Sequence, residues 1–135
     1  MTDRRLTDRD YRALAEFRHA LRVFLRFSED AARSEGLTPA QHQLLLAIRG
    51  HQQAAPSVGD LADVLQLRNN SVVGLVGRAD AAGLTRSATD PQDGRRRLVS
   101  LAPEGLAVLE RLSGRHRDEL RRFRDEMAAV LRELD

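Results

Sequence analysis

The sequence predicts a mainly α-helical domain with one small β-hairpin, and three observations support this. Helix-start signals recur, most clearly in the run Thr38-Pro39-Ala40-Gln41, with a capping Thr, a Pro in the first turn and a Gln three residues after the cap. Two short β-type runs, 84–88 and 98–101, flank a segment dense in turn residues. Apolar residues then recur in a heptad pattern from Leu106 to Leu134. A length of 135 residues fits a single domain.

Four helices are expected before the hairpin. They are predicted over 8–34 with Thr7 as cap, from Thr38 to about Gly50, from Ser57 to Leu65, and from Asn69 to Ala82. Gly36 and Gly83 end two of them, and Gln66-Leu67 forms a tight turn. Pro103 opens the last helical region, in which Gly114 is the point where a kink is expected.

Charge is unevenly distributed along the chain. All 22 basic residues are Arg, and residues 66–101 hold six of them against three acids, although the whole chain has a net charge of only +2. Local positive charge of this kind attracts a phosphate backbone. An Arg-rich solvated surface explains the same pattern, so charge alone leaves both interpretations open.

The composition of the chain excludes several kinds of function. The absence of cysteine excludes disulfides, thiol catalysis and Cys-ligated zinc. No apolar run reaches 18 residues and the N-terminus carries Asp3, Arg4 and Arg5, so neither a membrane span nor a signal peptide is expected and a cytoplasmic location is predicted. The four His lack metal-ligand spacing, and no motif for catalysis or cofactor binding occurs. We therefore expect no enzyme activity, no metal and no cofactor.

The order of the central elements is informative. A short helix, a tight turn and a second helix make a helix-turn-helix, and the hairpin after it makes a wing. An α-helix fits the major groove of DNA, while the narrow minor groove admits a loop tip that carries Arg. The expected wing loop, 90–97, ends in Arg95-Arg96-Arg97, with Asp90 and Asp93 placed to hold its shape.

Six runs of residues follow one another at residues 37–41, 61–67, 71–78, 82–84, 90–97 and 101–105. In their order they resemble the MarR family of winged helix-turn-helix regulators over residues 38–112. The last two runs are the most specific, because in that family the wing motif is followed at fixed spacing by the start of the next helix. The resemblance implies one domain over 1–135, with a winged helix-turn-helix at 38–101 and dimerisation helices at 1–36 and 103–135.

The resemblance also implies which residues meet DNA. The helix that starts at Asn69 would be the recognition helix, Arg95 would enter the minor groove, Arg96 or Arg97 would contact phosphates, and Asp93 would orient the wing arginines. The implied DNA contacts are Arg68, Asn69, Asn70, Ser71, Arg78, Arg95, Arg96 and Arg97. Two other interpretations stay open: Asn69 and Asn70 as helix caps, and Arg78 as the partner of Asp80 or of a wing acid.

Four positions depart from the family pattern, and one of them is Ala79, which replaces a usual Leu and predicts looser packing under the helix. Arg68 stands where a capping Ser is common, so the cap is expected to move to Asn69. Gly74 and Gly77 replace larger side chains and leave part of the groove-facing surface bare. We therefore expect sparse direct base readout, with more weight on the wing and on DNA shape.

The terminal helices are expected to form a dimer. The heptad seam and the resemblance together predict an interface that contains Tyr11, Leu109, His116, Leu120, Phe123 and Met127, and a purely internal helix is the alternative. The family further implies a small aromatic or phenolic effector between the dimerisation part and the winged lobes. Phe24, His42 and Arg49 are candidate contacts for it, although His42 also suits a packing role.

These observations predict a sequence-specific, ligand-responsive homodimeric regulator of transcription, a repressor that binds a pseudo-palindromic operator in double-stranded DNA. The alternative is a winged-helix dimer that acts as a protein-interaction adaptor and binds DNA weakly. The salt dependence of DNA binding would separate the two.

Overall fold

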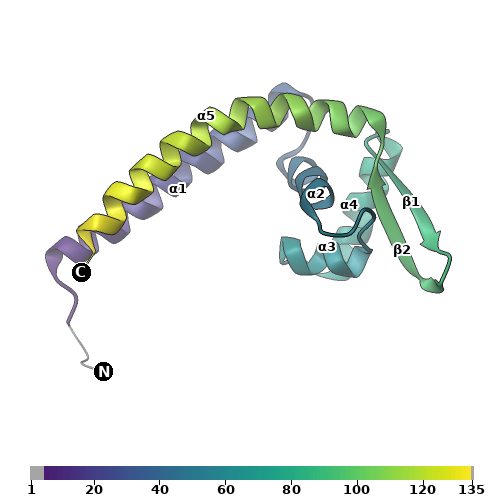
Figure 1. Cartoon of the computed structure of the whole chain (residues 1–135), viewed down its shortest axis with the longest axis horizontal. Coiled ribbons are helices and arrows are strands. Elements are labelled where there is room, and N and C mark those ends of the chain that lie inside the picture. Colours follow the sequence, from purple (N-terminus) through teal and green to yellow (C-terminus); the bar gives the residue numbers. More distant parts are fainter. Residues whose placement is uncertain (1–4, 135) are drawn as a thin grey trace. The chain divides into compact units, whose positions relative to one another are not determined.

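The computed structural model describes residues 5–134, which form five helices and one two-stranded antiparallel sheet (Figure 1). The elements are α1 Asp8–Ser34, α2 Pro39–Gly50, α3 Val58–Leu65, α4 Asn69–Ala81, β1 Thr85–Asp90, β2 Asp93–Leu101 and α5 Pro103–Glu133. The predicted fold class is confirmed. The charged residues Asp3 and Arg4 lie outside the described residues. Within the described part of the chain, no helix has the length and apolar character needed to cross a membrane.

Reciprocal capping explains where three of the helices begin. At α2 the Thr38 hydroxyl accepts the Gln41 N–H at 3.1 Å, and the Gln41 side chain accepts the Thr38 N–H at 3.0 Å. Thr7 with Asp10 and Ser57 with Asp60 make the same pair of bonds at α1 and α3. These predicted starts are confirmed.

The expected cap of α4 is wrong. Its N-cap residue is Arg68, in an extended conformation and with no side-chain capping bond, and Asn69 is already the first helical residue. The Arg68 carbonyl accepts the first intrahelical bond, from the Val72 N–H at 3.1 Å. The extended backbone at position 68 therefore decides where α4 starts, without help from a polar side chain.

The chain divides into two compact units. One comprises the described residues up to Ala31 together with those from Ser113 onward, and the other comprises Ala32–Leu112. Helices α1 and α5 each contribute to both units, and α5 continues without a break through Gly114. The winged unit thus includes the first part of α5, which the sequence assigned to the dimerisation helices.

In the first unit, α1 and α5 lie side by side and run antiparallel (Figure 1). The Phe24 and Phe123 rings pack with centroids 5.2 Å apart, and the Ser28 hydroxyl lies 2.9 Å from His116 Nε2. The α1 positions buried most deeply here are small, Ala13, Ala20 and Ala31. Small residues allow two helices to approach closely, and several larger apolar side chains of α1, among them Tyr11, Leu14 and Leu25, stay exposed.

In the winged unit, α2, α3 and α4 pack on one another and on the base of the hairpin. The side chains that are fully buried in it include Leu44, Leu45, Leu61, Val72, Val99 and Leu112. Leu109 is also buried in this core, with only 3% of its surface exposed. A side chain enclosed by its own unit has almost no surface for a partner, so the prediction that Leu109 lies in the dimer interface is corrected.

The first turn of α5 meets the segment that joins α4 to β1. The Ala102 N–H donates to the Leu84 carbonyl at 3.0 Å, and the buried Gly105 lies against the same peptide unit. A Cβ at position 105 would overlap the Leu84 carbonyl oxygen and lie 3.0 Å from its carbonyl carbon. Only glycine fits this close approach of two backbones.

The hairpin is longer than the sequence predicts. Its strands are Thr85–Asp90 and Asp93–Leu101, with Thr89 opposite Arg97 and Asp90 opposite Asp93, so the register shifts at this point. Arg95, Arg96 and Arg97 therefore lie on β2 and not on a loop over 90–97. The turn itself is short because the Asp90 carboxylate accepts the Gln92 N–H at 2.9 Å and closes it locally.

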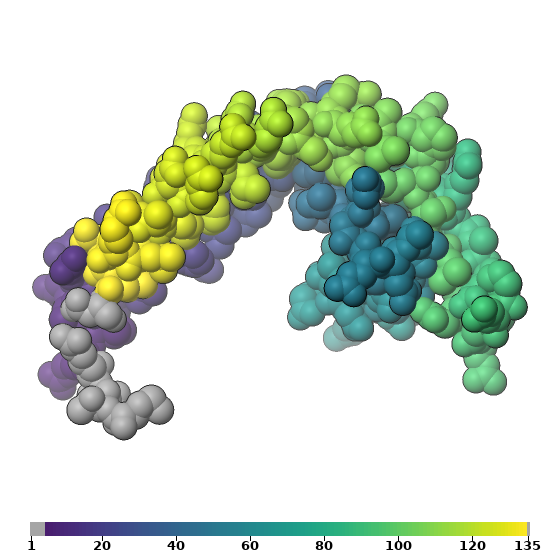
Figure 2. Space-filling view, viewed as in Figure 1, coloured from purple at the N-terminus to yellow at the C-terminus, as the bar shows by residue number. Residues whose placement is uncertain are grey.

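The base of the hairpin is joined to the start of α3. The Val99 N–H donates to the Pro56 carbonyl at 2.9 Å, and Ser57 forms an isolated antiparallel bridge with Leu98. Beyond this base, the hairpin projects from the helices of its unit (Figure 2).

Candidate nucleic-acid interface

Helix α4 has one buried face and one exposed face. Val72, Leu75, Val76 and Ala79 are buried in the winged unit. Arg68, Asn69, Asn70 and Ser71, the four expected DNA contacts at the helix start, are exposed. Because no side chain caps α4, its first N–H groups also remain available to an anion such as a phosphate.

The Arg78 side chain turns back along α4. A Cβ on Gly74 would lie 3.2 Å from Arg78 Nη1, so the guanidinium covers the place where a side chain at position 74 would stand. Asp80 does not pair with it, because its carboxylate accepts the hydroxyl groups of Thr85 and Ser87, the latter at 2.6 Å. The alternative in which Arg78 forms a salt bridge with Asp80 is therefore wrong, and the exposed guanidinium lies on the outer face of α4.

The three wing arginines are exposed but differ in their surroundings. Asp93 accepts the backbone N–H of Arg95 at 3.0 Å, which shapes the backbone of the strand and leaves the Arg95 guanidinium free of that carboxylate. Arg96 instead makes two ion pairs, with Asp60 at 3.5 Å and with Asp90 at 3.8 Å. Arg96 therefore braces the wing, whereas the exposed Arg95 and Arg97 are better placed to meet DNA.

Asp60 connects the helix-turn-helix to the wing, because it lies on α3 and pairs with Arg96 of β2. It is not among the site residues predicted from the sequence. The backbone N–H of Ser57 holds the pKa of Asp60 below its usual value, and the Ser57 hydroxyl, Arg96 and His51 act in the same direction against burial. The carboxylate thus stays ionised at neutral pH, where it caps α3 and pairs with Arg96. The Ser57-x-x-Asp60 spacing predicts the helix cap, but no local pattern in the sequence predicts the ion pair between Asp60 and Arg96.

The candidate effector contacts lie in different surroundings. Phe24 packs against His116 and Phe123 in the first unit, and His42 is buried in the winged unit. Arg49 is exposed and lines a cavity of about 410 Å³ together with Gln52, Leu101 and Leu106. The structure therefore gives Arg49 a place at a cavity, while Phe24 and His42 have packing roles.

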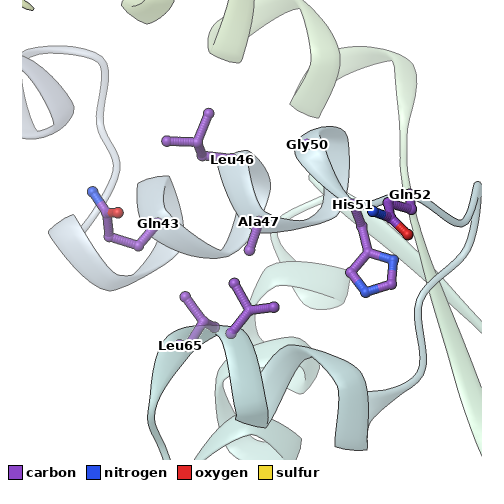
Figure 3. A pocket seen from close by; sticks show the side chains of 8 residues that line it. Gln43, Leu46, Ala47, Gly50, His51, Gln52 and Leu65 are labelled. Atoms are coloured by element: carbon purple, nitrogen blue, oxygen red, sulfur yellow. The ribbon is translucent and has the colours of Figure 1, made fainter.

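A second cavity in the winged unit lies between α2 and α3 and measures about 530 Å³ (Figure 3). Its lining is mainly apolar, with Leu46 and Val64 exposed at the surface and with His51 and Gln52 at one end. None of the three candidate effector contacts lines it. Among the described residues, no group of acidic or histidine side chains is arranged to hold a metal ion.

The remaining expected interface residues all belong to the first unit. Tyr11 and Leu120 are 60% and 54% exposed. His116, Phe123 and Met127 are half-buried, with the first two in contact with α1 of the same chain. The seam of α5 is therefore used partly for packing within the chain.

A model of the MarR family matches residues 35–96, which contain α2, α3, α4 and two of the three wing arginines, Arg95 and Arg96. This segment belongs to the MarR family. The similarity in fold extends over most of the chain. AbsC from Streptomyces coelicolor, a MarR family transcriptional regulator, superposes on 89% of this chain and on 81% of the AbsC chain. The TM-score is 0.76 and the sequence identity is 22%. Apo MarR from E. coli superposes on 84% of this chain and 87% of its own with a TM-score of 0.70, also at 22% identity.

Two curated relatives match part of the chain. The transcriptional activatory protein BadR of Rhodopseudomonas palustris is 37% identical over 84 residues, which are 62% of this chain and 48% of BadR. A putative transcriptional regulatory protein for the hcr operon of Thauera aromatica is 27% identical over 95 residues, 70% of this chain and 56% of that protein. The chain thus spans about half the length of these relatives. Both are regulators by name, in agreement with the prediction that the chain is not an enzyme.

Proposed function

We propose that this MarR-type chain regulates transcription by binding double-stranded DNA in a sequence-specific manner. One observation carries the proposal: an uncapped, polar α4 N-terminus and the exposed arginines of a wing belong to one winged helix-turn-helix unit. In the proposed complex, Asn69, Asn70 and Ser71 meet base edges and phosphates in the major groove. Arg95 enters the minor groove, and Arg97 contacts the backbone.

The proposed regulator is a homodimer on a pseudo-palindromic operator. The apolar side chains left exposed on α1 and α5 support this, since Tyr11, Leu14, Leu25 and Leu120 are each 44–60% exposed. A clustered apolar surface of this kind is typical of an interface. Two recognition helices related by a two-fold axis would then read half-sites about one helical turn apart.

The direction of regulation that we propose is repression, in which the bound dimer blocks the promoter. BadR is an activatory protein, so a reporter fused to the operator tests this point directly. Deletion of the gene should raise reporter expression. A fall on deletion would make the chain an activator.

We further propose that a small aromatic acid releases the chain from DNA. The solved structure of BpsR from Bordetella bronchiseptica concerns regulation of its DNA binding by 6-hydroxynicotinic acid. BpsR is 26% identical to this chain. It superposes on 86% of this chain and on 92% of the BpsR chain, with a TM-score of 0.66. In this chain one cavity is lined by the charged side chain of Arg49 and by the apolar side chains of Leu101 and Leu106, which suit the carboxylate and the ring of such an acid. If 6-hydroxynicotinic acid or salicylate weakens DNA binding by the native chain but not by Arg49→Gln, the proposal holds, and equal effects on both would refute it.

Selection of bound duplexes from a random DNA pool tests DNA binding itself. The native chain should enrich an inverted repeat, and Arg95→Ala should weaken binding to it by about 1–3 kcal/mol. Arg121→Ala is the matched control, because it removes an exposed Arg of the first unit and should leave affinity nearly unchanged.

Salt dependence separates this function from the adaptor alternative. A regulator that makes several phosphate contacts loses orders of magnitude in affinity between low and moderate salt while keeping its sequence preference. Absence of any enriched motif would favour an adaptor that acts through protein contacts.

A further inference from the structure

The exposed face of α4 carries one large apolar side chain, Val73, among polar residues, glycines and the small Ala81. Val73 is 57% exposed, and Asn70 and Gly77 flank it at the spacings that place residues on one side of a helix. The opposite face of α4 is buried through Val72, Leu75, Val76 and Ala79. Val73 is therefore no part of the core, and packing within its unit does not explain it.

Little surrounds Val73 on this face. A Cβ on Gly77 would meet no atom within 4 Å, and a Cβ on Gly74 would meet only the Arg78 guanidinium. Apart from the Arg78 guanidinium, the Val73 side chain thus stands above a surface with few neighbours. If α4 enters the major groove, the absence of side chains at positions 74 and 77 lets the middle of the helix approach the base edges closely, and Val73 is the side chain that this part presents to them.

The chemistry of the groove then selects the base. Every base edge in the major groove offers hydrogen-bond donors or acceptors, and thymine alone adds an apolar group, its 5-methyl. A valine over a purely polar edge would displace water without replacing its hydrogen bonds, which is unfavourable. A valine against the 5-methyl group instead removes two apolar surfaces from water.

We propose that Val73 is a specificity-determining residue that selects thymine in each half-site by contact with its 5-methyl group. This inference rests on the proposed function, because it requires α4 to lie in the major groove. It also changes the expectation of sparse base readout: beyond the polar first turn of α4, Gly74 and Gly77 remove side-chain contacts, and Val73 adds an apolar one.

Uracil substitution tests the proposal, because it removes the methyl group and keeps every hydrogen-bonding atom of the base. In the operator selected by the native chain, each thymine is replaced in turn by uracil and affinity is measured. At one thymine per half-site the native chain should lose about fourfold in affinity, the value for one buried methyl group. Val73→Ala, which removes both γ-methyl groups and shortens the reach of the side chain, should bind both duplexes equally well, and Val73→Thr, which keeps one γ-methyl group, should restore the preference for thymine.

Val64→Ala is the matched control. Val64 is also 57% exposed, but it lies on α3 outside the α4 face, so its loss should leave the fourfold preference intact. The proposal is overturned if no uracil substitution weakens native binding, or if Val73→Ala keeps the preference. Failure of the native chain to bind any duplex would overturn the proposed function as well, whereas tight binding that ignores the methyl group would overturn only the role of Val73.

Discussion

Replacement of Gly105 by alanine should destabilise the winged unit, although the same replacement in most helices is stabilising. The new Cβ would overlap the Leu84 carbonyl oxygen, which is backbone and cannot rotate away. Relief of the overlap must move α5 away from the segment between α4 and β1, which also breaks the bond from the Ala102 N–H to that carbonyl.

The size of the effect follows from three contributions. Overpacking against a rigid neighbour costs about 1–3 kcal/mol. Loss of a buried hydrogen bond adds about 0.5–1.5 kcal/mol. The gain in helix propensity from glycine to alanine returns at most about 1 kcal/mol. Gly105→Ala should therefore lower the free energy of unfolding by about 0.5–4.5 kcal/mol.

Urea unfolding followed by circular dichroism, at one protein concentration for all variants, measures this difference. Gly77→Ala is the control, because it makes the same chemical change in the exposed face of α4, where nothing lies within 4 Å of the new Cβ. It should raise stability by up to about 1 kcal/mol. If Gly105→Ala proves as stable as the native chain, the close approach of α5 to Leu84 is refuted.

Three further changes test other parts of the molecule. Asp60→Asn should destabilise the chain at pH 7, and the loss should shrink at acid pH. The folded-state pKa of Asp60 lies below its usual 3.8, so the ionised carboxylate stabilises the fold above 3.8, and this contribution fades as the pH falls through the folded-state value. Urea midpoints at pH 7 and at pH 3 measure the change. A difference that is equal at both pH values would exclude the ionised carboxylate as the cause. Leu120 is 54% exposed on α5, and Leu120→Asp should make the proposed dimer monomeric, as light scattering would measure, and abolish operator binding. A variant that stays dimeric and still binds DNA would contradict the proposed interface. Ser57→Ala should cost about 1 kcal/mol through loss of the α3 cap, whereas Ser71→Ala, at an exposed site in the uncapped first turn of α4, should have little effect in the same unfolding assay.

Local signals predicted most of the secondary structure. Thr38 and Ser57 begin helices because their hydroxyl groups reach N–H groups only three residues away, and such short-range geometry is visible in a sequence. The start of α4 followed a different rule, since Arg68 takes the N-cap position through its backbone alone. The sequence therefore predicted the helix but misplaced its cap.

Features that depend on distant residues were beyond the reach of the sequence. The strands of the wing are longer than expected because pairing with the opposite strand, and not β propensity, decides where they end. Arg96 or Arg97 was expected on phosphates, and the ion pair of Arg96 with Asp60 was not foreseen because Asp60 is 36 residues away in the chain. Leu109 fits a heptad seam as well as it fits a core, and only the packing of α5 in the winged unit distinguishes the two.

Val73 was within reach of the sequence. The positions 72, 75, 76 and 79 follow the helical period of a buried face, and position 73 lies out of phase with them. Its apolar side chain lies among the polar residues that predict DNA contacts, so the polar pattern of the helix hides it.

The junction between the hairpin and α3 has a consequence for the order in which the chain folds. A two-stranded hairpin is marginal by itself, and this one is completed by the bond from Val99 to Pro56, which closes a loop that contains α3 and α4. The wing should therefore form after those helices have docked. Once it is formed, amide hydrogen exchange should be slowest at Val99, which opens only when the unit unfolds, and fast near Gly94. The wing would thus meet DNA with a rigid base and a tip free to adapt to the width of the groove.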